Sequence, residues 1–273
     1  RDAWSGSAEQ YDAYEQRWHF YGAVGDAMVR ELPLEENSRV LELACGTGAC
    51  TRTLARIVRT GTVVALDYSE GMLEVARRNS LAARPSCVVF VHGDAVDIER
   101  LLKGMRFDFA VCNSAFWHFP EPERVLRALH DLLTEAGQFA LSLPTWVEGN
   151  SERRESFRAM AREVLKKYGV TPEQVDAASA EWPRPTVDLP RLLVRSGFTV
   201  REVPFEMPVS PGSRAAWRQI SVFSERGARS RLFPGLDPAV RRQVREELDA
   251  WRRAQPPRDD RSSRWRILVA QRS

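Results

Sequence analysis

The chain has 273 residues, of which 43% are hydrophobic and 28% charged, and its formal net charge is only +3. This length and composition are typical of a globular protein that buries a sizeable core. No run of 18 apolar residues and no signal-peptide pattern occurs, which excludes an obvious membrane-spanning helix.

The first half of the chain alternates short apolar runs with amphipathic segments. We expect strands at residues 39–43, 62–66, 88–91, 107–112 and 139–143. Helices are expected at 49–59, around Met72, Leu73 and Ala76, and from 121 to 133, with an end near Gly137. Five strand–helix alternations predict an α/β fold with a doubly wound, mostly parallel sheet.

The alternation is interrupted at residues 145–187, where we expect a helix at 151–168 that stops at Gly169 and a short helix from Thr171. A helix at 189–195, a strand at 198–205, helices at 213–226 and 238–253 and a strand at 265–270 follow, which makes seven strands. We interpret residues 1–273 as one domain with an N-terminal aromatic helical segment (1–30), a helical cap (145–187) and additional C-terminal helices (207–263).

The four cysteines are expected to be reduced and buried. Cys45, Cys50, Cys87 and Cys112 lie on or beside apolar runs, and none of them forms a CxxC pair. This pattern favours a cytoplasmic protein over a disulfide framework or a zinc site, and we predict no metal.

Charge is unevenly distributed along the chain. Residues 213–273 hold 15 Arg and no Lys against 7 Asp plus Glu. Such a segment can mark a surface for nucleic acid or another acidic partner. The alternative, which we favour, is that arginine stems cover helix surfaces.

The stretch VLELACGTGAC, residues 40–50, resembles a dinucleotide-binding turn but carries an acid. Glu42 would repel a pyrophosphate on the loop Gly46–Gly48, and Thr51 stands where a third glycine or alanine is expected. The amide donors of this loop suit a carboxylate, and Glu42 suits an ammonium group. A ligand with an amino-acid tail and a ribose therefore fits better than a dinucleotide.

Two further acids follow the next strands. Asp67 comes 21 residues after Gly46, at the spacing where an acid binds ribose hydroxyls, and Asp94 closes the third strand in HGDAV. Three acids around one pocket suit a cationic ligand that contains a nucleoside. The ligand predicted is S-adenosyl-L-methionine (SAM).

Four ordered stretches resemble the motifs of class I SAM-dependent methyltransferases, whose fold is Rossmann-like. They are VLELACGTG, VVALDYSEGML, VHGDA and FDFAVCNSAFWHFPEPERVLRALHDLLTEAGQFALSLP. Within that family, these motifs most resemble those of the small-molecule group that includes the ubiquinone and menaquinone biosynthesis methyltransferases. The resemblance covers residues 38–143 well, and 188–205 and 264–270 loosely.

The resemblance implies a role toward the cofactor for eleven residues. These are Glu42, Ala44, Gly46 and Gly48 at the methionine end, Asp67 at the ribose, Tyr68, Met72, Asp94 and Ala95 at the adenine, Asn113 near the sulfonium, and Tyr11 on an N-terminal helix folded over the edge. Alanine stands at position 44, where the family often has glycine. Structural alternatives are helix capping for Glu42 and Asp67, core packing for Met72, turn formation for Asp94 and Asn113, and, for the N-terminal helix with Tyr11, an amphipathic helix that packs on the sheet.

The acceptor is expected to be small and partly hydrophobic, with O- or C-methylation favoured and secondary metabolism as one setting. His118, after the fourth strand, is the candidate general base; its alternative is packing. Aromatic residues are expected to enclose the pocket: Phe116, Trp117, Trp146 and Trp182, with Tyr11, Tyr14, Trp18, Phe20 and Tyr21 from the N-terminal segment.

Two other classes stay open. A nucleic-acid or protein methyltransferase would use the arginine-rich tail, but Ser114 and Ala115 follow Asn113 where an Asn-Pro-Pro-aromatic signature would continue. A SAM-binding protein that transfers no methyl group would carry the same motifs.

Overall fold

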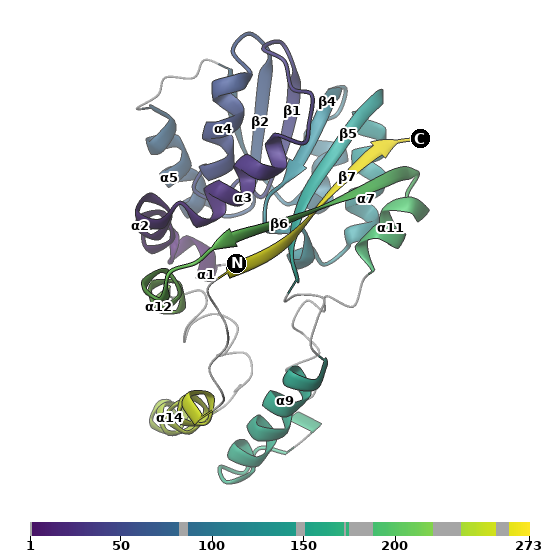
Figure 1. The fold of residues 1–273 in the computed structure, drawn as a ribbon. Helices are drawn as coiled ribbons and strands as arrows, with labels where there is room; N and C mark the ends of the chain where they lie inside the picture. Colours follow the sequence, from purple (N-terminus) through teal and green to yellow (C-terminus); the bar gives the residue numbers. More distant parts are fainter. Residues whose placement is uncertain are drawn as a thin grey trace.

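A computed structural model describes residues 2–81, 87–145, 151–171, 173–174, 188–220, 236–254 and 262–273. Its centre is a seven-stranded sheet in the order β3-β2-β1-β4-β5-β7-β6 (Figure 1). The strands are β1 (Arg39–Leu43), β2 (Thr62–Asp67), β3 (Val88–His92), β4 (Phe107–Cys112), β5 (Leu133–Pro144), β6 (Phe198–Pro208) and β7 (Ser262–Arg272).

The first five strands are parallel, and β7 runs antiparallel between β5 and β6. The predicted doubly wound, mostly parallel, seven-stranded sheet is therefore confirmed. In the register, Glu42 on β1 pairs with Ala65 on β2 and Val111 on β4. Because the carboxyl ends of parallel strands meet at one edge, residues that follow β1, β2 and β4 converge there.

Helices cover both faces of the sheet. Helix α7 (Pro122–Leu132), helix α11 (Leu189–Arg195) and the short α6 (Ile98–Leu101) pack over Leu41 and Leu43. The opposite face, which carries Val40, is covered by α3 (Phe20–Val29) and α4 (Ala49–Ile57). Helix α5 (Glu70–Leu81) lies over β2 and β3. The apolar stripes that predicted α4 and α7 are buried, and each large side chain in them contributes about 1.5–3 kcal/mol.

The fifth strand is longer than its sequence suggests. Helix α7 ends at Leu132, and β5 begins at once at Leu133 instead of after Gly137. The ladder between β4 and β5 shifts register between Phe107 and Phe109, which accommodates the extra residues. The expectation of a helix end near Gly137 was wrong, because Gly137 lies within the strand.

Three helices, not one, form the N-terminal segment. They are α1 (Asp2–Ser5), α2 (Ala8–Trp18) and α3. The break between α2 and α3 falls at His19, which adopts the left-handed conformation with φ 44°. Figure 1 shows α1 and α2 beside α5, near the lower end of the strands.

The insertion after β5 contributes α9 (Ser151–Lys166), which packs against α14 (Pro238–Ala254), away from the sheet (Figure 1). Leu165 of α9 and Val244 of α14 are fully buried in their shared core. Glu247 accepts hydrogen bonds from Lys167 and Tyr168. The sequence predicted a cap from residues 145–187 and the N-terminal segment; in the structure the partner of α9 is α14.

Some expectations lie outside the described residues. These are the positions of Trp146 and Trp182, most of the short helix expected from Thr171, and residues 221–226 of the helix expected at 213–226. The described part of that last helix is α12 (Pro211–Gln219).

Candidate active site

The strand-end acid of β1 is buried against α4. Glu42 is 1% exposed and accepts a hydrogen bond of 2.6 Å from Thr51 Oγ1. Burial raises the pKa of Glu42 to about 8; the bond from Thr51 opposes the shift and the nearby Asp67 carboxylate adds to it. The Glu42 carboxyl is therefore largely protonated at neutral pH, and a positive charge beside it would favour its ionisation.

Asp67 ties the glycine loop to the end of β2. Its carboxylate accepts hydrogen bonds from Gly46 N at 2.8 Å and Ser69 N at 2.9 Å. Burial raises the pKa of Asp67, and these amide bonds oppose the shift. Asp67 thus fixes the loop and the turn that leads into α5, whereas the first amides of that helix are met by Ser69, whose Oγ accepts from Met72 N.

The loop itself is built from left-handed residues. Ala44, Gly46 and Gly48 have φ values of 53°, 56° and 84°. A non-glycine residue in this conformation costs on the order of 1–3 kcal/mol, and such strain tends to persist at functional sites. Position 44, where the resembling family often has glycine, is thus a place where glycine would fit without strain.

The expected adenine side is covered by the N-terminal helices. Met72 is 2% exposed and packs in a cluster with Ala8, against which Trp4 and Tyr11 lie. Burial raises the pKa of Tyr11, and the charges of Glu15 and Asp67 raise it further. Tyr11 also stacks on the ring of Tyr21, with 5.2 Å between the ring centres, and its expected place at the edge of the cofactor stays a prediction.

The remaining residues of this side close β2 and β3. Tyr68 is half-buried and Ala95 is buried. Asp94 Oδ1 accepts from Val96 N at 3.2 Å and so caps the single-turn helix η1 (Ala95–Asp97). Asp94 therefore forms the turn that was the structural alternative for this residue. Its role toward the adenine stays a prediction.

Asn113, which follows β4, is held on both sides of its amide. Its Nδ2 donates to the Tyr21 carbonyl at 2.9 Å, and its Oδ1 accepts from Ser142 Oγ at 2.8 Å. Ser114 beside it has φ 58°. Asn113 therefore joins the strand end to the start of α3.

His118 lies in the short helix η2 (Phe116–His118) and packs among aromatic rings. Its ring centre is 5.9 Å from that of Trp4 and 5.3 Å from that of Trp117. Burial lowers the pKa of His118 to about 4. The imidazole is therefore neutral at pH 7 and free of a proton on one nitrogen. By contrast, His130 packs on Phe198, on another part of the fold.

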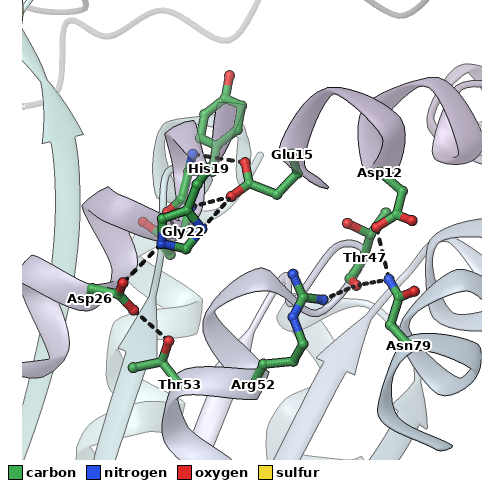
Figure 2. Close-up of polar contacts among 11 residues, drawn as sticks. Asp12, Glu15, His19, Gly22, Asp26, Thr47, Arg52, Thr53 and Asn79 are labelled. Atoms are coloured by element: carbon green, nitrogen blue, oxygen red, sulfur yellow. Dashed lines mark hydrogen bonds and ion pairs between the residues drawn. The ribbon is translucent and has the colours of Figure 1, made fainter. Parts of the chain in front are cut away.

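Sequence reasoning missed the polar network beneath the N-terminal helices (Figure 2). Buried Asp12 accepts from Asn79 Nδ2 at 2.8 Å, and the same amide nitrogen donates to the Thr47 carbonyl in the glycine loop at 3.1 Å. His19 Nε2 lies 3.0 Å from Asp26, which accepts a 2.5 Å bond from Thr53 on α4. The only sequence signal was a pair of acids, Asp12 and Glu15, among the aromatic residues of an amphipathic helix.

No group of three or more His, Cys, Asp or Glu side chains that could hold a metal occurs among the described residues. Within the same part of the chain, no helix is both long and apolar enough to cross a membrane.

The sheet order, the left-handed glycine loop and the strand-end acids define a methyltransferase fold of the Rossmann-like type. Comparison with known proteins identifies the domain in the first half of the chain. Residues 40–137 match the family model of the methyltransferase domain. Residues 40–137 therefore form a SAM-dependent methyltransferase domain, and S-adenosylmethionine is its cofactor.

Two curated relatives illustrate the range of the family. A malonyl-[acyl-carrier protein] O-methyltransferase from Priestia megaterium is 24% identical over 203 residues, 73% of this chain and 68% of the relative. A demethylmenaquinone methyltransferase from Staphylococcus saprophyticus is 29% identical over 111 residues, 40% of this chain and 46% of the relative. The alignment thus spans about half the length of the second relative.

The solved structure of the [4+2]-cyclase SpnF has the same fold, with a TM-score of 0.56 and 17% identity over 92% of this chain and 80% of the cyclase. At this identity the likeness establishes the fold alone.

Proposed function

We propose that this chain transfers the methyl group of SAM to a small, partly hydrophobic acceptor, with oxygen or carbon as the favoured methylated atom. The observation that carries the proposal is a hydrophobic cluster rich in aromatic side chains, which includes Trp265 opposite Pro144 at the carboxyl end of β5. Its buried members are Tyr14, Tyr21, Val24, Ile220 and Trp265, and Trp4, Tyr11, Trp18, Phe20, Trp117 and Trp217 pack around them. Aromatic walls with a few polar groups suit an acceptor of this kind.

The residues of the site fit the cofactor. The loop amides suit the methionine carboxylate, Glu42 suits its ammonium group, and Asp67 suits the ribose hydroxyls. The Thr47 hydroxyl within the loop is buried and has no hydrogen-bond partner among the described residues, as expected where a polar ligand completes the site. Ala44, Gly46 and Gly48 line this end, Tyr68, Met72, Asp94 and Ala95 the adenine end, and Tyr11 and Asn113 the two sides.

SAM supplies a methyl group on a positively charged sulfur. The protein contributes alignment, exclusion of water by aromatic walls and, for an acceptor hydroxyl or acidic carbon, a base. The neutral ring of His118 supports that last role. It lies beside Trp4 and Trp117, and it can accept the acceptor's proton as the new bond forms.

The two relatives are named for different methyl acceptors, a demethylmenaquinone and a malonyl group on a carrier protein. The ring-rich wall favours an acceptor of the first chemical kind, a phenol, quinol or enol, over a carrier-bound carboxylate. The four buried free cysteines support a reducing, cytoplasmic setting.

The test is a methyl-transfer assay with isotope-labelled SAM and a panel of phenols, naphthoquinols and carboxylates. We expect label in a phenol or quinol product, together with release of S-adenosylhomocysteine. Labelling of carboxylates alone would contradict the proposal.

A second candidate function is a SAM-binding protein that transfers no methyl group. It is suggested by the cyclase SpnF, which has this fold and is named for a reaction other than methylation. Bound SAM without release of S-adenosylhomocysteine, across the same panel, would support a SAM-binding protein that transfers no methyl group.

A further inference from the structure

Glu15 is a buried carboxylate that the proposed function does not use. It lies on α2, is 1% exposed, and accepts hydrogen bonds from Tyr21 N at 2.9 Å and Gly22 N at 2.6 Å. These are among the first amides of α3, which have no partners within their own helix. A carboxylate at this place also complements the positive end of the helix dipole. Glu15 thus caps α3 from the preceding helix.

The chain approaches Glu15 too closely for any side chain at position 22. A Cβ atom on Gly22 would lie 2.7 Å from Glu15 Oε1 and 2.3 Å from the His19 ring. The sharp α2–α3 junction, with His19 in the left-handed conformation, therefore closes directly around the carboxylate (Figure 2).

The residue that Glu15 holds is Tyr21, which is also in contact with residues of both sides of the expected cofactor site. Asn113 Nδ2 donates to its carbonyl, Tyr11 stacks on its ring at 5.2 Å between ring centres, and Trp217 Nε1 donates to its hydroxyl at 2.7 Å. Tyr11 and Asn113 are two of the residues expected beside the cofactor. Tyr21 therefore connects both sides of the cofactor site with the aromatic cluster.

We propose that Glu15 is a positioning residue: it fixes the backbone of Tyr21, so that Tyr11 and Asn113 are held in the arrangement that binds SAM. The inference rests on the proposed function for the location of the cofactor. It concerns the shape of the SAM site and does not depend on which acceptor is methylated.

The test compares Glu15→Gln with Glu9→Gln in the 273-residue chain. A glutamine keeps the shape of Glu15, but its NH₂ group faces an amide donor, so one of the two bonds is lost. Glu9 lies on the same helix in an exposed ion pair with Arg78, and exposed pairs contribute little. We expect Glu15→Gln to weaken SAM binding roughly tenfold by calorimetry, and Glu9→Gln to leave it nearly unchanged.

A second measurement distinguishes positioning from a general loss of stability. The indole N–H of Trp217 bonds Tyr21 and is not a partner of Glu15, so its NMR resonance reports where Tyr21 lies. We expect this resonance to move in Glu15→Gln and to stay in Glu9→Gln. If Glu15→Gln does not fold, Gly22→Ala is the second variant. Its added methyl group would lie 2.7 Å from Glu15 Oε1 and would push the carboxylate away from the Tyr21 amide, while the exposed His19 ring can move aside.

A folded Glu15 variant with unchanged SAM affinity, or with an unmoved Trp217 resonance, would overturn the proposal. Both measurements use SAM alone and no acceptor. Failure of the methyl-transfer assay would therefore leave this test valid, and failure of this test would leave the proposed reaction untouched.

Discussion

At the residue scale, the site contains carboxylates whose ionisation is controlled by burial. Glu42 and Asp67 both have raised pKa values because burial penalises their charged forms. They are neighbours across the glycine loop, so two negative charges there would repel each other. A cation bound between them would remove that conflict, and this gives the site a pH dependence that can be measured.

The first prediction follows from the pKa of Glu42, about 8. Below pH 8 the free site holds a proton on Glu42, and binding the positively charged ammonium of SAM favours its release. SAM affinity should therefore rise with pH up to about 8, by as much as roughly tenfold per unit, and then level off. Calorimetry across pH 6–9 measures the slope, and Glu42→Gln should flatten it. A flat profile in the unaltered protein would contradict this account.

The raised pKa of Glu42 affects folding stability in the opposite direction, so that stability falls as pH rises. A carboxyl whose pKa is raised by folding favours the folded state most below its unfolded pKa, and that contribution is lost as pH rises toward 8. The Glu42 contribution thus weakens the ligand-free protein over the range in which it strengthens SAM binding.

The second prediction concerns Asp67. Asp67→Ala removes the expected partner of the ribose and leaves the amides of Gly46 and Ser69 without their acceptor. We expect SAM affinity to fall by about 1.5–3 kcal/mol, roughly tenfold to more than a hundredfold. The measurement is calorimetry on the folded variant; an unchanged affinity would disprove the assignment.

The third prediction concerns His118. If the acceptor must lose a proton, His118→Ala should lower the turnover rate by on the order of 10²–10⁴ while SAM affinity stays close to that of the parent chain. Because burial places the pKa of His118 at about 4, its contribution to the rate should stay constant from pH 6 to 8. An unimpaired His118→Ala variant would leave alignment alone as the mechanism.

At the element scale, the sequence located most helices and strands and missed how some of them associate. Strands β1 and β4 and helix α11 match their expected bounds residue for residue, because each is a short apolar run with clear flanking signals. Strand β5 was cut short because Gly137 resembled a helix stop. The pairing of α9 with α14 joins segments about 80 residues apart, and no local pattern reports such a contact.

The fourth prediction tests whether the α9–α14 pair acts on the acceptor. Leu165→Ala removes a fully buried side chain from the core of the pair and should cost about 2–5 kcal/mol there. We expect faster hydrogen exchange in α9 and α14 and slower acceptor turnover, with SAM affinity within about threefold of the parent. Val194→Ala, a matched truncation at a 59% exposed site on α11, is the control. Loss of SAM binding in Leu165→Ala would refute a separate cap.

At the scale of the whole molecule, the strand-end acids could be predicted because strand order alone brings them to one edge. The junction around Glu15 could not, since its partners Tyr21 and Gly22 follow a left-handed turn that nothing in the sequence around His19 announces. The strand-end residues of the site could therefore be predicted from motifs of the sheet, whereas the contacts made by the N-terminal helices that fold over the site could not.

Charge is the other property of the whole molecule, and it bears on the last prediction. The sequence suggested that arginines of residues 213–273 cover helix surfaces, but several described ones lie on β7. Arg264 and Arg266 pair with Glu206 and Glu202 on β6, and Arg272 donates to a backbone carbonyl. Positive charge that is matched by neighbouring acids attracts phosphates weakly, so we expect Arg264 and Arg266 to contribute little to any binding of nucleic acid.

We therefore expect RNA and DNA to be neither ligands nor methyl acceptors. Phosphate contacts through several free arginines would make binding fall steeply with salt, whereas occasional surface contacts give weak binding at every salt concentration. Fluorescence anisotropy with a labelled RNA and a labelled duplex DNA, at low and at physiological salt, measures this directly. The label-transfer assay is run with the same two nucleic acids. Micromolar binding at physiological salt with a steep salt slope, together with methylated RNA, would reverse the assignment to a small-molecule enzyme.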